Sequence, residues 1–324
     1  MAYAQAKDVD VSLIPVIDLT DINSGDSSLL QRIADDIVQA AETSGFFYVK
    51  NHGIPDELID QVYSTAGDFF RRPVDEKSQV KVNQNHRGFL ATGGAKMSDD
   101  AKPDLKESFI WGLDVDDQDP DFLAGRALIG PNQWPEFLPE MRNTMVAYFD
   151  AANNLAWNLF KVFAVALDLP ADHFIKTVDK PMTRCSIIYY PPQEADAGAD
   201  QFGVAPHTDF GALTLLRQDE VGGLQVQDKN GDWVTAHPIE GTLVVNVADL
   251  LSRWTNNRFA STPHRVVNTS GRERFSIVAA VDPNYDTDMT PIVREGEEPL
   301  FDPTTCGEYL VWRFAQAFKY RNKG

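Results

Sequence analysis

The strongest chemical signal in this 324-residue chain is a histidine and an aspartate two positions apart, followed later by a second histidine. His207 and Asp209 lie in a Pro-His-Thr-Asp-Phe-Gly stretch, and His264 follows a Thr-Pro pair. Alternate residues of a β-strand point to the same face, so a strand would direct His207 and Asp209 the same way. Two imidazoles and one carboxylate are typical of mononuclear non-haem iron(II) sites that keep three coordination positions open. We therefore predict that His207, Asp209 and His264 bind iron(II).

An anion-binding pair follows the second histidine. Arg274 and Ser276 are separated by one residue, so a strand would present a guanidinium and a hydroxyl on one face. Such a pair suits a carboxylate, because guanidinium donors match its two oxygens. Each of these signals is weak alone, but their order along the chain is specific. The sequence thus predicts a metal site beside a carboxylate site.

Composition narrows the class of protein. Lysine and arginine number 29, aspartate and glutamate 48, and the net charge is −19. This balance argues against nucleic acid or an anionic membrane as a partner. The two cysteines, Cys185 and Cys306, are too few for a disulfide framework. Neither a signal peptide nor a run of 18 apolar residues is present, so we expect a cytoplasmic enzyme without an obligate protein partner.

The first half of the chain reads as mostly helical. Apolar residues recur at helical spacing between about 27 and 44, between 55 and 70, and along a long stretch from Trp134 to about Asp168. Short strands are expected at 14–19 and 46–49, and 1–11 reads as a loose lead-in. These helices are expected to pack against a sheet that carries the site residues.

The second half changes to short apolar runs separated by turn signals such as Asn230-Gly231. Strands are expected at 183–190, 213–216, 223–227, 233–234, 243–247, 265–267 and 275–280, with a polar loop over 193–203 and a helix over 309–318. This density of strands favours a jelly roll, or double-stranded β-helix. The fold class is therefore α+β with a mainly β core, flanked by N-terminal helices, a long backing helix and a C-terminal helix. We expect one unit over 1–324: a helical region (1–180), the jelly-roll core (181–285) and a C-terminal extension (286–324).

Several segments resemble the isopenicillin N synthase-like dioxygenases of the 2-oxoglutarate- and iron-dependent superfamily. The resemblance lies in the Ile-Pro-Val-Ile-Asp stretch at 14–18, the Gly-Phe-Phe junction at 45–47 and the Lys-Asn-His-Gly-Ile-Pro turn at 50–55. It continues through Arg-Gly-Phe at 87–89, Lys-Glu-Ser-Phe at 106–109 and Gly112, and it spans nearly the whole chain. The metal and anion residues described above fall where that family carries its own.

The resemblance implies a function and a set of cofactors. Members bind Fe(II), 2-oxoglutarate and O2, and they hydroxylate an unactivated C–H bond of a small molecule, with ring closure or desaturation as other outcomes. 2-Oxoglutarate becomes succinate and CO2. Arg274 and Ser276 match the family residues that hold its far carboxylate, and Tyr190 matches a tyrosine that precedes a Pro-Pro pair and reaches the same group.

The chain departs from the family in the strand that ends at Tyr190. Ile188 stands where plant members have asparagine, and Ser186 where many bacterial members have arginine; here an arginine comes two residues earlier, at Arg184. Alternation places Arg184 on the face of Tyr190, so Arg184 could meet an acidic or carbonyl group of the substrate, or form a surface ion pair. Phe109 and Trp254 are further candidates for the substrate pocket, and equally candidates for the core.

Three other functions compete with this prediction. An iron oxidase of the same fold would not use 2-oxoglutarate and would hold a substrate carboxylate at Arg274 and Ser276. A sensor or binding protein would keep the fold and the metal without turnover, although the intact ligand set argues against it. A zinc hydrolase would accept the same ligands, but no general base accompanies them.

Overall fold

Two β-sheets face each other in the computed structural model, which describes residues 6–7, 13–94, 102–193 and 201–318. The larger sheet runs in the order β1 (Val16–Asp18), β2 (Phe46–Lys50), β10 (Thr242–Val247), β7 (Leu213–Gln218), β12 (Arg274–Val281), β5 (Arg184–Tyr190), β4 (Glu107–Gly112), β3 (Gly88–Leu90). The smaller sheet runs β6 (Val204–His207), β11 (His264–Val266), β8 (Leu224–Gln227), β9 (Trp233–Ala236). Within the larger sheet, β1 pairs parallel with β2 and the other neighbours pair antiparallel. The predicted jelly-roll core is confirmed.

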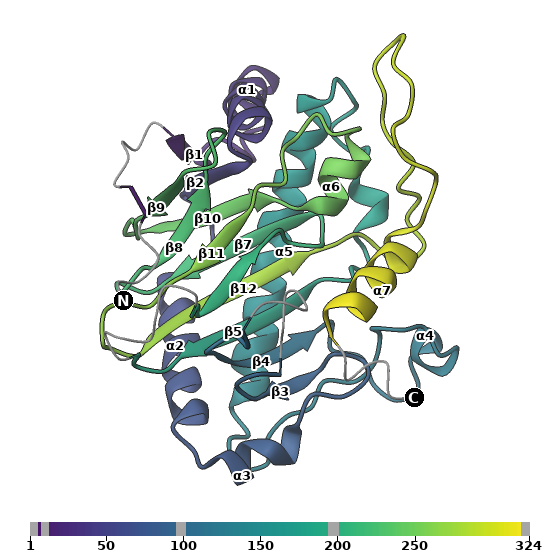
Figure 1. Cartoon of the computed structure of the whole chain (residues 1–324). Helices are drawn as coiled ribbons and strands as arrows, with labels where there is room; N and C mark the ends of the chain where they lie inside the picture. The colour runs from purple at the N-terminus through teal and green to yellow at the C-terminus, as the bar shows by residue number, and fades with distance from the viewer. Residues whose placement is uncertain (1–5, 8–12, 95–101, 194–200, 319–324) are drawn as a thin grey trace.

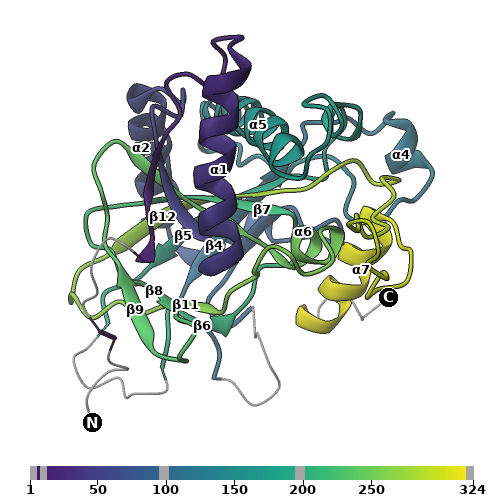
Figure 2. The same cartoon turned by 90° about the horizontal axis from the view of Figure 1, so that it is seen from above.

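Three helices cover the larger sheet on the side away from the smaller one, as Figures 1 and 2 show. They are α1 (Ser27–Thr43), α2 (Asp56–Phe70) and α5 (Met141–Ala166), and α1 and α2 both pack on α5. The remaining helical segments are α3 (Val74–Lys77), η2 (Ser78–Val80), α4 (Pro120–Leu123), η3 (Ile175–Thr177), α6 (Asp249–Trp254) and α7 (Cys306–Ala317). The α+β class is therefore confirmed, with α5 as the predicted backing helix.

Side-chain alternation divides the core into two layers. On β2, Phe47 and Val49 join the large hydrophobic cluster between the sheet and the helices. Phe46 and Tyr48 join a smaller cluster that also contains residues of β6, β8 and β11 and therefore fills the space between the sheets. Side chains of β2 thus pack into both layers of the hydrophobic core.

Two helix boundaries differ from the sequence-based expectation. The long helix begins at Met141 instead of Trp134, because Pro135 and Pro139 interrupt the segment and proline lacks the N–H that a helix interior needs. The C-terminal helix begins at Cys306 instead of Tyr309. Its first turn is fixed by a capping box in which Thr305 and Glu308 each accept the other's backbone N–H. Most of the predicted lead-in (1–11) and of the loop at 193–203 lies outside the described residues.

Gly45 makes the sharp junction between α1 and β2 possible. Its φ is +68°, and a Cβ built there would lie 2.0 Å from the carbonyl oxygen of Ala260. Only glycine both adopts this positive φ readily and leaves room for the Ala260 carbonyl. The N-terminal helix is thereby tied closely to the segment that leads to β11.

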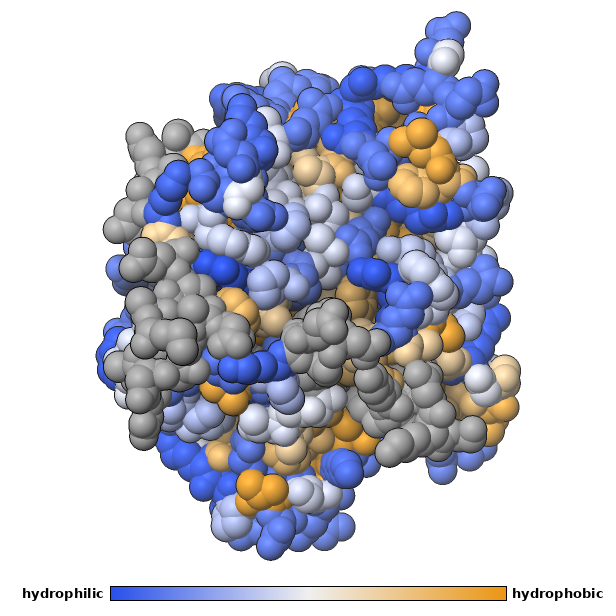
Figure 3. All heavy atoms as spheres, viewed as in Figure 1, coloured by the Kyte–Doolittle hydropathy of each residue, from blue (hydrophilic) through white to orange (hydrophobic). Residues whose placement is uncertain are grey.

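The surface seen in Figure 3 is dominated by hydrophilic residues, with hydrophobic residues in small separate groups. Within the described residues, no helix combines the length and the apolar character needed to cross a lipid bilayer.

Candidate metal centre and anion fork

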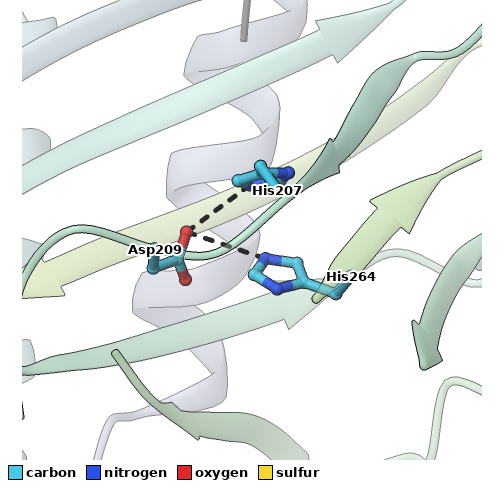
Figure 4. Close-up of side chains that lie close together, drawn as sticks. All are labelled: His207, Asp209 and His264. Carbon is cyan, nitrogen blue, oxygen red and sulfur yellow. Dashed lines mark ion pairs between the residues drawn. The ribbon is translucent and has the colours of Figure 1, made fainter. Parts of the chain in front are cut away.

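The two candidate histidines lie directly opposite each other in the smaller sheet. His207 ends β6, His264 begins β11, and the antiparallel register pairs them. Directly paired residues of one ladder project to the same face, which explains why their ring centroids lie 4.3 Å apart. Figure 4 shows both imidazoles turned toward Asp209.

Asp209 lies beyond the end of β6, so it is positioned by the loop that follows this strand and by side-chain contacts, not by the strand alternation that the sequence suggested. Its Oδ2 accepts hydrogen bonds from Thr214 Oγ1 at 2.6 Å and Asn246 Nδ2 at 2.9 Å. Its Oδ1 lies 3.5 Å from Nε2 of His207 and 3.6 Å from Nε2 of His264. One carboxylate oxygen is thus anchored to the larger sheet, and the other faces the two imidazoles.

Both imidazoles are oriented by their own backbone. His207 Nδ1 lies 2.8 Å from the carbonyl oxygen of Ala205, and His264 Nδ1 lies 3.2 Å from that of Thr262. A proton on Nδ1 that donates to a carbonyl leaves the Nε2 lone pair for a metal, the arrangement expected of metal-bound histidine.

The protonation states also suit a metal. Burial lowers the pKa of His264 to about 4, so its imidazole is neutral at neutral pH. Burial acts to raise the pKa of Asp209, but the nearby imidazoles of His264 and His207 outweigh it and hold that pKa well below its usual range. The Asp209 carboxylate and the imidazoles of His207 and His264 offer ligand atoms that all lie within 4.8 Å of one another, and such a set could hold a divalent iron ion.

The anion fork lies on the opposite sheet. Arg274 and Ser276 are neighbours on one face of β12 and are 0% and 1% exposed. The Arg274 guanidinium donates to the Gly222 carbonyl and, at 3.4 Å, to Gln218 Oε1. Among the described residues, neither Arg274 Nη1 nor Ser276 Oγ has a hydrogen-bond partner. Leaving a buried cationic donor unpaired is costly, so these two atoms fit a carboxylate ligand.

Tyr190 lies beside the fork. It is the register partner of Arg274, and the guanidinium carbon lies 4.5 Å from the centroid of its buried ring. This cation–π contact fixes the plane of the guanidinium.

One cavity of about 200 Å³ joins the metal cluster to the fork. It lies between the sheets, and its wall includes the three candidate metal ligands, Arg274, Ser276 and Tyr190. A molecule that bound both features would therefore lie between the two sheets of the jelly roll. The arrangement can hold a metal ion and a short dicarboxylate side by side.

The substrate candidates are placed differently from one another. Arg184, Ser186, Ile188 and Tyr190 all line the cavity, as the alternation of β5 predicts. Arg184 forms an ion pair with Asp282 at 2.8 Å, and this pair is buried, not exposed on the surface as one interpretation of the sequence held.

Phe109 and Trp254 lie in the hydrophobic core instead of in the cavity wall. Phe109 packs on Phe69 of α2 because alternation along β4 turns it toward the helices, and Trp254 packs on Phe174. The β4 residues that do line the cavity are the neighbours of Phe109, Ser108 and Ile110.

Other lining residues were not singled out from the sequence. His86, Phe210 and two aromatic residues of the C-terminal segment, Phe314 and Phe318, line the cavity near Arg184. Lys106, which directly precedes β4, lines it toward the Tyr190 end of β5. Phe314 and Phe318 lie in the C-terminal segment, where the sequence predicts a helix over 309–318. In the structure both rings form part of the cavity wall.

Comparisons with known proteins point to one family. Residues 14–137 match the family model described as the non-haem dioxygenase in morphine synthesis N-terminal, and residues 182–283 match that of the 2OG-Fe(II) oxygenase superfamily. The chain is 33% identical to the 2-oxoglutarate-Fe(II) type oxidoreductase hxnY of Emericella nidulans, over 94% of this chain and 90% of that protein. It is 36% identical to the oxidoreductase ppzC of Metarhizium majus, over 98% and 91%.

Comparison with solved structures indicates the same family. A full-length Neurospora crassa protein, crystallised in complex with alpha-KG and thymine, superimposes with a TM-score of 0.83 at 31% identity, over 93% of this chain and 96% of that one. Fold, site and relatives define a non-haem iron oxygenase that uses 2-oxoglutarate. The chain belongs to the 2OG-Fe(II) oxygenase superfamily.

Proposed function

We propose that His207, Asp209 and His264 bind Fe(II) and that Arg274, Ser276 and Tyr190 bind the far carboxylate of 2-oxoglutarate. The unpaired Nη1 of Arg274 and Oγ of Ser276 carry this proposal. Two buried donors on one strand face have no partner among the described residues, and a dicarboxylate supplies one.

Fe(II) held by His207, Asp209 and His264 would supply, with 2-oxoglutarate and O2, the oxidation of a substrate C–H bond in which 2-oxoglutarate is converted to succinate and CO2. The protein's residues prepare this chemistry. Thr214 and Asn246 hold the Asp209 carboxylate in place, and the Ala205 and Thr262 carbonyls fix the imidazoles. The two sheets exclude water from the reacting groups.

We further propose that the substrate is a small molecule that enters the cavity beside Arg184. The Neurospora crassa structure holds thymine together with alpha-KG, which supports a substrate of this size. The chain's net charge of −19 argues against nucleic acid, and we expect residues 1–324 to act as one dioxygenase unit without an obligate protein partner. The cytoplasmic location stays a prediction.

An anaerobic titration tests the co-substrate site. Adding Fe(II) and then 2-oxoglutarate to the metal-free protein should produce the weak visible charge-transfer band of the chelated metal. In Arg274→Ala, about ten to one hundred times more 2-oxoglutarate should be needed, because two or more charged hydrogen bonds are lost.

Arg272→Ala is the matched control. Arg272 lies two residues earlier and pairs with exposed Glu220, so its removal should leave the titration unchanged. Iron binding without any band in the native protein would sink the proposal. It would favour an oxidase that holds a substrate carboxylate in the fork.

A further inference from the structure

The far end of the cavity carries a second buried cation. Arg184 and Tyr190 stand at opposite ends of β5, six residues apart, which corresponds to roughly 20 Å along an extended strand. The fork therefore lies at one end of this strand and Arg184 at the other. A molecule bound at Arg184 would not compete with 2-oxoglutarate for the fork.

The charge of Arg184 is already balanced. Its guanidinium lies 2.8 Å from Asp282 Oδ2, and the Asp282 side chain is completely buried. Asp282 Oδ1 accepts the backbone N–H of Ala212, and the missing side chain of Gly211 leaves room for this carboxylate. The buried pair is therefore built into the loop that carries Asp209.

Among the described residues, the remaining lysine or arginine of the cavity wall, besides Arg184 and Arg274, is Lys106, which lies toward the Tyr190 end of β5 and is also paired. Lys106 Nζ lies 3.4 Å from Asp104 Oδ2, with both side chains at most 10% exposed. Arg87 is buried near Arg184 but does not line the cavity, and its N–H groups donate to the carbonyls of Asn85, His86 and Leu128. A substrate anion would thus meet cations that already hold carboxylates, and burying it would cost more than it gains.

The Arg184 guanidinium can donate further hydrogen bonds. A guanidinium has five N–H groups, and with the described residues Arg184 makes two hydrogen bonds, to Asp282 and to the Met182 carbonyl. Because guanidinium only donates, the ligand group that meets it must accept. A carbonyl oxygen accepts without adding charge.

The walls around Arg184 are aromatic. The guanidinium carbon lies 4.6 Å from the Phe314 ring centroid, and Phe210 meets the same ring edge-on at 5.8 Å. The centroid of the His86 ring lies 4.8 Å from that of Phe314 and 4.7 Å from that of Phe318. Such rings favour a flat molecule that can stack or meet them edge-on.

Building on the proposed function, we propose that the substrate is an uncharged planar ring compound that presents a carbonyl oxygen to Arg184 among the rings of Phe210, Phe314 and Phe318. Asp282 sets this preference, because it neutralises the guanidinium. Removing the charge of the Asp282 carboxylate should therefore make the Arg184 site prefer anionic ligands.

Matched pairs of ring compounds test the proposal: benzamide with benzoate, 5-formyluracil with 5-carboxyuracil, and 2-naphthamide with 2-naphthoate. Calorimetry without oxygen would measure the binding of each, both to the Fe(II)- and 2-oxoglutarate-loaded protein and to the protein without either. The uncharged member of at least one pair should bind about tenfold more tightly than its carboxylate partner. If no uncharged member binds, or if the carboxylates bind better, the inference is wrong.

Asp282→Asn should reverse the preference, since asparagine can still accept the Ala212 N–H but leaves Arg184 charged. The carboxylate members should gain about tenfold in affinity relative to their partners. Asp286→Asn, which removes an exposed carboxylate paired with Arg126, should leave the ratio as it is. An unchanged ratio in folded Asp282→Asn would contradict the inference.

Two further arms complete the test. If Asp282→Asn does not fold by circular dichroism, Arg184→Met combined with Asp282→Asn replaces it. Methionine has no N–H to donate, so this double variant should abolish the binding of the uncharged rings, and unchanged binding would contradict the inference. The two proposals fail separately. Ring binding without 2-oxoglutarate binding would contradict the co-substrate assignment alone, and the reverse would contradict the substrate class alone.

Discussion

His207 and His264 are paired across β6 and β11, and this register places the centroids of their imidazole rings 4.3 Å apart. The ladder of the smaller sheet thus predefines two of the three ligand positions. Only the carboxylate of Asp209 needs further support, which it receives from the larger sheet. The experiments below separate these contributions.

Removing either histidine should abolish iron binding. In His264→Ala two ligands remain, too few for a stable iron site, so Fe(II) affinity should fall by more than about one hundredfold. The iron content of the purified protein and an anaerobic iron titration would measure this. His173→Ala is the control, because His173 is exposed and packs on Phe174 away from the cavity. Normal iron content in His264→Ala would show that the metal binds at another place in the protein.

Thr214→Val should weaken iron binding without removing a ligand. Thr214 holds Asp209 Oδ2, and loss of such an orienting hydrogen bond typically costs about 10- to 100-fold in metal affinity. Thr183→Val is a matched control, because the buried Thr183 hydroxyl donates to Asn153 outside the site. The control should lower stability and leave iron affinity intact; equal iron affinities in the two variants would contradict the anchoring role of Thr214.

Ile188→Asn should be tolerated by the fold. Ile188 lines the cavity and pairs in register with Ser276, so an amide there faces the ligand space instead of the closely packed core. We expect a change in the 2-oxoglutarate requirement with little change in the melting temperature. Ile187→Asn, one position along, is the comparison: Ile187 is fully buried in the helix-side core, and its replacement should destabilise the fold. If Ile188→Asn loses as much stability as Ile187→Asn, the side chain at position 188 belongs to the core.

Gly45→Ala should be among the most destabilising glycine substitutions. The new Cβ would combine a positive φ with a clash against the Ala260 carbonyl, and we expect a loss of about 3 kcal/mol or more in the free energy of unfolding. Gly25→Ala has a similar φ of +78° but open space, so it should lose only about 1 kcal/mol. Urea denaturation would compare the two, and equal losses would show that the clash at Gly45 is relieved.

Local patterns predicted most of the fold and the site. The residues that alternate along β5 and β12 follow from strand geometry, so the faces of Arg184, Tyr190, Arg274 and Ser276 could be inferred without a structure. The helices followed from apolar periodicity, with errors where prolines or a capping box set the boundary. Those features are local, and sequence carries local information well.

Contacts between distant segments were not predictable in the same way. Asp282 is one acidic residue among 48, and nothing near it in the sequence marks it as the partner of Arg184. Phe109 and Ser108 are adjacent, and only the packing of α2 on one face of β4 decides which of them meets the cavity. The substrate end of the site depends on such contacts, which is why sequence reasoning assigned it least accurately.

The division of the site between the sheets has a mechanical consequence. Iron would be held by His207 and His264 on the smaller sheet and by Asp209, whose carboxylate is supported by the larger sheet. The far end of 2-oxoglutarate would be held by the larger sheet alone. When both are present, the pair forms a crosslink through the interior of the sandwich, and separating the layers would require breaking it. The loaded protein should then resist heating by more than the sum of the two separate effects, because 2-oxoglutarate would join the two sheets only when iron is also bound.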